Sequence, residues 1–160
     1  LSDAIAVYDR LSSGKKEKGL VICYGSMYGN TERMAEALAE GAAEAGMQKI
    51  VIHNLSVSET SFVLADVFRY DTLAIGSPTY NGGVFPLVED FLARLSERIV
   101  SNHKLGLFGG YTWSSQAVKK MMAYNEKMKM QLIDKTVEWK QGVSQDSLSK
   151  VKELGRLLAE

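Results

Sequence analysis

Ser26-Met27-Tyr28-Gly29-Asn30-Thr31 separates a short apolar run at residues 19–24 from a run rich in Ala, Glu, Leu and Met at residues 32–45. The apolar, β-branched run predicts a buried strand, and the second run predicts a helix. The first N–H groups of a helix lack partners within it, and the helix dipole adds partial positive charge there. A strand, a tight polar loop and a helix start in this order therefore predict an anion-binding site.

The loop itself offers uncharged hydrogen-bonding groups. Ser26, Asn30 and Thr31 add side-chain donors, and Gly29 lets the backbone turn and approach a ligand closely. No Lys or Arg lies within the loop, which suits a phosphate monoester held by neutral donors. The alternative interpretation is that Asn30 or Thr31 merely caps the helix.

The length and net charge of the chain limit the classes of protein to which it can belong. The chain has 160 residues, enough for one domain with a sizeable core. Its 19 basic and 19 acidic residues balance, so charge favours neither nucleic acid nor an anionic membrane surface. No apolar run is long enough to span a bilayer, and the amino end lacks a signal-peptide pattern. The single cysteine, Cys23, excludes a disulfide framework and favours a reducing, cytoplasmic location.

The amino end predicts a segment separate from the main domain. Residues 2–11 have apolar side chains at helical spacing, and residues 12–18 form a polar, flexible run. We therefore expect a helix and linker over residues 1–17, a remnant of a preceding domain, before the main domain at residues 18–160. The start at Leu1 rather than Met agrees with a processed or excised piece.

Apolar runs and helical patterns alternate five times along the main domain. The expected strands span residues 20–24, 49–55, 71–76 and 104–110, and the fifth lies at 130–134 or 136–139 or crosses both. The expected helices span residues 31–45, 58–70, 84–99 and 114–125, and a last helix starts at Ser147. This alternation predicts an α/β fold with a five-stranded parallel sheet, in the order 2-1-3-4-5, and helices on both faces.

Polar loops follow the first, third and fourth expected strands, at residues 26–31, 77–83 and 111–115. In the order 2-1-3-4-5 these strands are neighbours, so their carboxyl ends bring the three loops to one cleft. Aromatic residues in the second and third loops, among them Tyr80 and Trp113, supply flat walls beside the anion site. The loops together predict a ligand with a phosphate tail and a planar ring, a shape that flavin mononucleotide (FMN) has.

These motifs resemble those of flavodoxins and, more narrowly, of the flavodoxin-like domain at the C-terminal end of flavodiiron proteins, or A-type flavoproteins. The matching stretches are Ser26-Met27-Tyr28-Gly29-Asn30-Thr31-Glu32, Gly76-Ser77-Pro78-Thr79-Tyr80-Asn81 and Gly109-Gly110-Tyr111-Thr112-Trp113-Ser114. The resemblance covers residues 18–160 and implies a flavodoxin-like fold with an FMN site.

The resemblance also implies a role for each loop. The phosphate would be held by Ser26, Met27, Tyr28, Gly29, Asn30 and Thr31. The ring and its pyrimidine edge would be bordered by Ser77, Pro78, Thr79, Tyr80, Asn81 and Gly82. The ring pocket would be completed by Gly110, Tyr111, Thr112 and Trp113. Trp113 would lie against one face of the flavin.

An electron carrier is the function that this resemblance implies. Its donor would be a rubredoxin-like protein or an NAD(P)H-dependent reductase, and its acceptor a diiron centre that reduces oxygen or nitric oxide on a preceding domain. No catalytic side chain is expected, because the chemistry belongs to the flavin. The alternative is a flavodoxin-like NAD(P)H:quinone or FMN reductase, whose pocket is usually built at a homo-oligomer interface.

Other classes fit the residues less well. A phosphoacceptor receiver domain needs clustered acidic residues after the first and third strands, and residues 24–26 and 76–77 offer none. No G-x-G-x-x-G follows the first strand, which argues against a Rossmann dinucleotide site. The chain is neutral, whereas typical flavodoxins are strongly acidic, so an acidic docking face is not expected here.

Three further residues receive structural interpretations. His53 and His103 are expected to be structural, because no metal-ligand spacing surrounds them, and this chain is therefore expected to bind no iron. Trp139 is expected to pack in the core or at a sheet edge rather than to contact a ligand.

Overall fold

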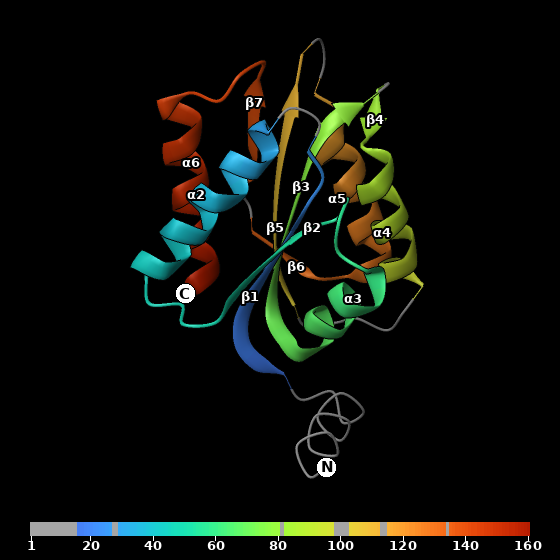
Figure 1. Ribbon diagram of the computed structural model, residues 1–160, viewed down its shortest axis with the longest axis vertical. Helices are drawn as coiled ribbons and strands as arrows, with labels where there is room; N and C mark the ends of the chain where they lie inside the picture. The colour runs from blue at the N-terminus through green and yellow to red at the C-terminus, as the bar shows by residue number, and fades with distance from the viewer. Residues whose placement is uncertain (1–15, 27–28, 81, 98–102, 113–114, 134) are drawn as a thin grey trace.

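The computed structural model describes residues 16–26, 29–80, 82–97, 103–112, 115–133 and 135–160. Its strands are β1 (Glu17–Tyr24), β2 (Ile50–Asn54), β3 (Tyr70–Tyr80), β4 (Gly83–Val84), β5 (Lys104–Tyr111), β6 (Gln131–Leu132) and β7 (Val137–Lys140). Its helices are α2 (Asn30–Glu44), α3 (Thr60–Arg69), α4 (Pro86–Ser96), α5 (Ala117–Met128) and α6 (Gln145–Ala159). Figure 1 shows a central twisted sheet with α2 and α6 on one side and α3, α4 and α5 on the other. The predicted α/β architecture with helices on both faces is confirmed.

The sheet has the predicted order with two additions. The main path is β2-β1-β3-β5-β6, and the pairs along it are parallel. Counting only these strands in chain order gives the predicted order 2-1-3-4-5. The short strand β4 returns antiparallel to the end of β3, and β7 pairs with the second half of β5.

The fifth position of the sheet is shared by two strands. Gln131 of β6 pairs with Lys104 at the start of β5, whereas Trp139 of β7 pairs with Gly110 near its end. Both predicted segments, residues 130–134 and 136–139, therefore line up along β5 as a broken strand. Residue 134 lies between them, outside the described residues.

Two strands are longer than predicted. β1 begins at Glu17, not Leu20, because Glu17 pairs with Tyr70 and its carboxylate accepts a hydrogen bond from Arg69 Nε at 3.1 Å. Glu17 and Lys18 are thus part of the sheet rather than of a linker. β3 continues to Tyr80 through residues that were predicted to be a loop. They remain extended because β5 pairs with them first and β4 pairs with them beyond it.

Helix boundaries follow local chemistry. The helix predicted from residue 84 starts at Pro86, because Val84 is in β4 and Pro is preorganised for the first helical position. Its predicted end at residue 99 lies outside the described residues. α5 starts at Ala117 rather than residue 114 and ends at Met128, where Lys129 takes the left-handed conformation with φ 56°.

Each face of the sheet has its own hydrophobic core. On one face α3, α4 and α5 cover side chains of the central strands, including Leu73, Ile75 and Leu107. On the other face α2 and α6 cover a second set, including Ile22 and Phe108. The central strands are buried on both faces, which explains why their sequences are nearly continuous apolar runs. No described helix is long and apolar enough to cross a membrane.

Helices α2 and α6 cross at two glycines. A Cβ atom on Gly41 would lie 2.1 Å from the Lys152 carbonyl oxygen, and one on Gly155 would lie 2.2 Å from the Leu38 carbonyl oxygen. The backbones therefore touch where any larger residue would hold them apart. Because α2 starts at the polar loop, this crossing fixes the direction in which its N-terminus points.

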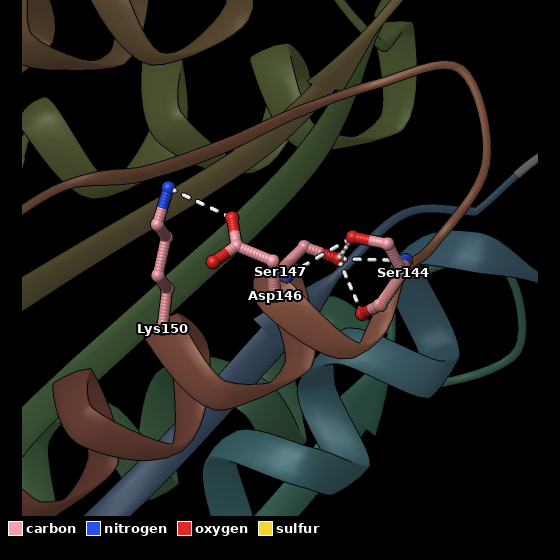
Figure 2. Close-up of polar contacts among 4 residues, drawn as sticks. All are labelled: Ser144, Asp146, Ser147 and Lys150. Carbon is pink, nitrogen blue, oxygen red and sulfur yellow. Dashed lines mark hydrogen bonds and ion pairs between the residues drawn. The ribbon is translucent and has the colours of Figure 1, made fainter.

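α6 begins with a reciprocal cap (Figure 2). Ser147 N–H donates to Ser144 Oγ at 3.2 Å, and Ser144 N–H donates to Ser147 Oγ at 2.9 Å. One turn further on, Lys150 reaches Asp146 at 3.0 Å, but both side chains are largely exposed. The cap satisfies helix N–H groups, whereas the exposed ion pair is screened by water.

Replacing Gly155 with Ala should lower the free energy of unfolding by about 1–3 kcal/mol, because the added methyl overpacks the helix crossing. Urea unfolding would measure this. Gly142→Ala is the matched control, since a Cβ there meets nothing within 4 Å, and we expect it to change stability by less than about 0.5 kcal/mol. Equal effects of the two substitutions would contradict the crossing described here.

Replacing Ser144 with Ala should cost about 1 kcal/mol, because the cap of α6 is lost. Lys150→Ala, which removes only the exposed ion pair, should cost less than about 0.5 kcal/mol. Thermal unfolding of the two variants side by side tests this order, and the reverse order would show that the cap contributes little.

Candidate functional site

A cleft opens at the carboxyl ends of β1, β3, β5 and β7. Its cavity has a volume of about 100 Å³ and is open to solvent. The residues that line it are Ser26, Asn30, Thr31, Pro78, Thr79, Gly110, Tyr111, Thr112, Trp139 and Gln141. The convergence of the three predicted loops on one cleft is therefore present in the structure.

The first wall is the loop between β1 and α2. Gly29 has φ 82°, in the left-handed region that favours glycine, and its N–H donates to Ser26 Oγ at 2.9 Å. This turn leads directly into α2 at Asn30. No described side chain caps the helix, which contradicts the interpretation of Asn30 or Thr31 as a simple cap. The first N–H groups of α2 thus meet the cleft with the partial positive charge of the helix end.

The second wall comes from the end of β3. Pro78 and Thr79 line the cleft, and Thr79 Oγ1 accepts a hydrogen bond from Ala117 N–H, 3.2 Å away, at the start of α5. Ser77 is fully buried and does not line the cleft. Its hydroxyl accepts from Phe85 N–H at 3.0 Å, so Ser77 ties the β3–β4 turn together.

Tyr80 is not among the described residues that line the cleft. Its ring packs edge-on against Phe85, with centroids 6.0 Å apart, and the residue is 38% exposed. Gly82 has φ 73° and shapes the neighbouring turn rather than the cleft wall. The predicted cofactor roles of Tyr80, Gly82, Ser77 and Gly29 stay predictions, and none of these four residues lines the cleft.

The third wall is built from the end of β5. A Cβ atom on Gly110 would lie 2.7 Å from the Trp139 indole, so only glycine leaves room for this ring beneath the loop. Trp139 also stacks on Phe108, with ring centroids 6.4 Å apart. Tyr111 and Thr112 continue the wall beyond Gly110. Four predicted site residues, Met27, Tyr28, Asn81 and Trp113, lie outside the described residues.

Trp139 and Gln141 were not predicted to line the cleft. Trp139 is 5% exposed and packs in the core as expected, but it also forms part of the cleft wall. Alternation of apolar and polar residues along Val137–Lys140 is the sequence signal that could have found this part of the wall. It indicates a strand whose carboxyl end lies at the same edge as the three loops.

The described lining of the cleft is uncharged. Tyr24, at the end of β1, donates its hydroxyl to the Glu32 carboxylate at 3.3 Å. Burial and the neighbouring Glu32 carboxylate raise the pKa of Tyr24 to about 12. Its phenol therefore remains a neutral donor at physiological pH, and the exposed Glu32 lies in the first turn of α2. Neutral donors around a helix N-terminus suit an anionic group that brings its own charge.

Both histidines make structural hydrogen bonds, as predicted. His53 Nε2 lies 2.7 Å from an Asp66 oxygen, and its Nδ1 lies 3.3 Å from Ser58 Oγ, which ties β2 to α3. His103 is fully buried and its Nε2 donates to the Val67 carbonyl at 2.7 Å. Within the described ranges, His, Cys, Asp and Glu form no group of three or more that could hold a metal ion.

Comparison with known proteins agrees with this architecture. The family model described as flavodoxin matches residues 22–155. A nitric oxide reductase from Moorella thermoacetica is 33% identical over 160 residues, which cover 97% of this chain and 39% of that protein. The crystal structure of the flavodiiron protein from Giardia intestinalis superimposes with a TM-score of 0.89 at 29% identity, covering 99% of this chain and 39% of that chain. An archaeal flavodoxin of 21% identity has a TM-score of 0.78 and is covered over 96% of its length, against 88% of this chain.

The coverage differs between these relatives. The chain spans about two fifths of the two longer proteins, the reductase and the flavodiiron protein. It spans almost all of the archaeal flavodoxin. The part that this chain shares with the two solved structures is thus the doubly wound fold.

Acidification should destabilise the fold through His103. Burial lowers the pKa of His103 below its usual value, so below about pH 6.5 the unfolded chain takes up a proton that the folded chain resists. Stability is therefore fully present above that pH and is lost as the pH falls toward the folded pKa. His103→Gln, which can still donate to the Val67 carbonyl, should reduce this loss. Urea unfolding at pH 7.5 and 5.5 measures it, and an identical pH dependence in both proteins would contradict the assignment.

Proposed function

Because the chain belongs to the flavodoxin family, we propose that its cleft binds flavin mononucleotide and that the bound flavin relays electrons between redox partners. The observation that supports this most strongly is the meeting of three separate strand ends around one uncharged cleft beside an uncapped helix N-terminus. A flavin is the cofactor of this family. Its phosphorylated form matches the anion site at α2.

The residues present fit the two ends of such a ligand. Ser26, Asn30 and Thr31, with the first N–H groups of α2, form an uncharged donor set for the phosphate. Pro78 and Tyr111 offer flat surfaces on the other side of the cleft for the ring. The predicted contacts that no described cleft residue supports rest on the family resemblance; they are those of Met27, Tyr28, Gly29, Ser77, Tyr80, Asn81, Gly82 and Trp113.

The flavin supplies the electron-transfer chemistry when it is bound. The protein's part is to orient it, to limit its exposure to water and to place hydrogen-bonding groups and charge near its ring. No acid, base or nucleophile from the chain is required, so we assign no catalytic side chain. Tyr24, whose phenol stays neutral, adds no charge to the cleft.

The two longer relatives indicate an acceptor for the electrons. One is named a nitric oxide reductase and another a flavodiiron protein, and this chain matches about two fifths of each. We therefore propose that the chain is the flavin-carrying part of such a system and passes electrons to a diiron centre that reduces nitric oxide or oxygen. A rubredoxin-like protein or an NAD(P)H-dependent reductase would supply them.

The absorption spectrum of the purified protein, alone and after addition of FMN, tests the proposal. A yellow protein, or a colourless one that takes up FMN tightly, would support it. A protein that neither contains nor binds FMN would refute it. Direct turnover of NADH with a quinone, without a protein donor, would instead identify a reductase.

Thr31→Val should weaken FMN binding about tenfold or more, because a hydrogen bond to a charged group is lost from a nearly isosteric side chain. Thr31 is 2% exposed and lines the cleft. Thr60→Val, at the first residue of α3, is the matched control and should leave the affinity unchanged. Fluorescence titration measures both, and equal affinities in the two variants would place the phosphate elsewhere.

A further inference from the structure

Gln141 occupies an unusual position at the mouth of the cleft. It follows the last residue of β7 and lines the cleft with its side chain exposed. Its φ is 62°, in the left-handed region that residues with a Cβ rarely adopt. The only other described non-glycine residue with positive φ is Lys129, which ends α5.

One backbone hydrogen bond and the packing of a nearby residue hold the Gln141 backbone in place. Its N–H donates to the Tyr111 carbonyl at 2.7 Å, which closes the β5–β7 ladder at its last pair, Tyr111 with Lys140. Two residues before it, Trp139 packs against Gly110 and stacks on Phe108. The backbone of Gln141 is therefore fixed to the third wall of the cleft. A residue with a side chain thus lies at the cleft although the chain could turn there more easily with glycine.

The chemistry of a carboxamide indicates what it can bind. It offers N–H donors and a carbonyl acceptor without charge. A phosphate needs only donors, and the α2 end of the cleft already supplies them. A sugar-alcohol chain has hydroxyl groups that both donate and accept, so a carboxamide can satisfy it from either side.

We propose that Gln141 hydrogen-bonds the hydroxyl groups of the ribityl chain that joins the ring and the phosphate of the flavin. This inference rests on the proposed function, since it assigns a further contact within the same cleft. It makes Gln141 a binding residue that selects for the sugar-alcohol part of the ligand, and Trp139 the residue that positions it.

The binding of three flavins distinguishes which part of the ligand Gln141 contacts. FMN has the chain and the phosphate, riboflavin has the chain alone, and lumiflavin has only the ring. Gln141→Ala should weaken FMN and riboflavin about fivefold, as expected for one neutral hydrogen bond, and leave lumiflavin unchanged. Gln131→Ala is the matched control, because this exposed glutamine pairs with Lys104 at the opposite end of β5. It should change none of the three affinities.

Gln141→Gly controls for an effect of the substitution on folding stability. Glycine tolerates φ 62°, so this variant should unfold at the same or a higher temperature than the original chain while losing the same flavin affinity. Flavin fluorescence titration and thermal unfolding, each on the full chain, give the two readouts. Agreement between the Ala and Gly variants would support a role of the side chain itself.

The other outcomes overturn the inference in different ways. A loss confined to FMN would assign Gln141 to the phosphate, and an equal loss for all three flavins would assign it to the ring or to the shape of the cleft. Unchanged affinities in both variants would mean that Gln141 contacts no part of the ligand. Failure of the original chain to bind any flavin would refute the proposed function, and this inference with it.

Discussion

The arrangement of the strand ends depends on two aromatic rings that occupy the space of missing side chains. Phe108 lies where a Cβ on Gly76 would be, within 2.1 Å, and Trp139 lies where a Cβ on Gly110 would be, within 2.7 Å. A shift of one residue between these strands would bring a side chain against a ring or turn the ring out of the core. The register of β3, β5 and β7 is fixed in this way, and with it the positions at which the polar segments leave the sheet. Across the same face, the glycine crossing of α2 and α6 sets the start of α2, so the walls of the cleft are placed by the packing beneath them.

The parts of this structure that were predictable from sequence have strong local signals. The apolar runs at β1, β3 and β5 are buried on both faces, and the polar residues after each run stand out against them. Because parallel strands end at one edge, the meeting of Ser26, Pro78 and Thr112 follows from chain order alone. The fold and most of the cleft needed no more than this. The three loops together had also predicted a phosphorylated ligand with a planar ring, and the match to the flavodoxin family supports a flavin.

The parts that the sequence did not specify depend on contacts distant in sequence. β6 and β7 are two and four residues long, and only their shared partner β5 shows that both belong to the sheet. In the sequence Trp139 resembles a core residue, and it does pack in the core. Its further place in the cleft wall depends on Gly110, whose missing side chain leaves room for the indole. Tyr80 pairs with β4 in a hairpin and packs edge-on against Phe85, a contact that its sequence neighbourhood did not indicate. In each case the residue that determines the position is identified only by the tertiary structure.

The uncapped first turn of α2 also links ligand binding to the stability of the fold. Its N–H groups have no side-chain cap within the described residues, so the folded chain retains binding capacity that the unfolded chain lacks. By mass action, any ligand taken up there shifts the equilibrium toward the native state in proportion to the logarithm of its free concentration. A ligand at about 100 times its Kd would add about 2.7 kcal/mol, a large part of the about 5–15 kcal/mol by which native proteins resist unfolding. Under the proposed function, scarcity of the flavin would thus lower the abundance of the folded protein.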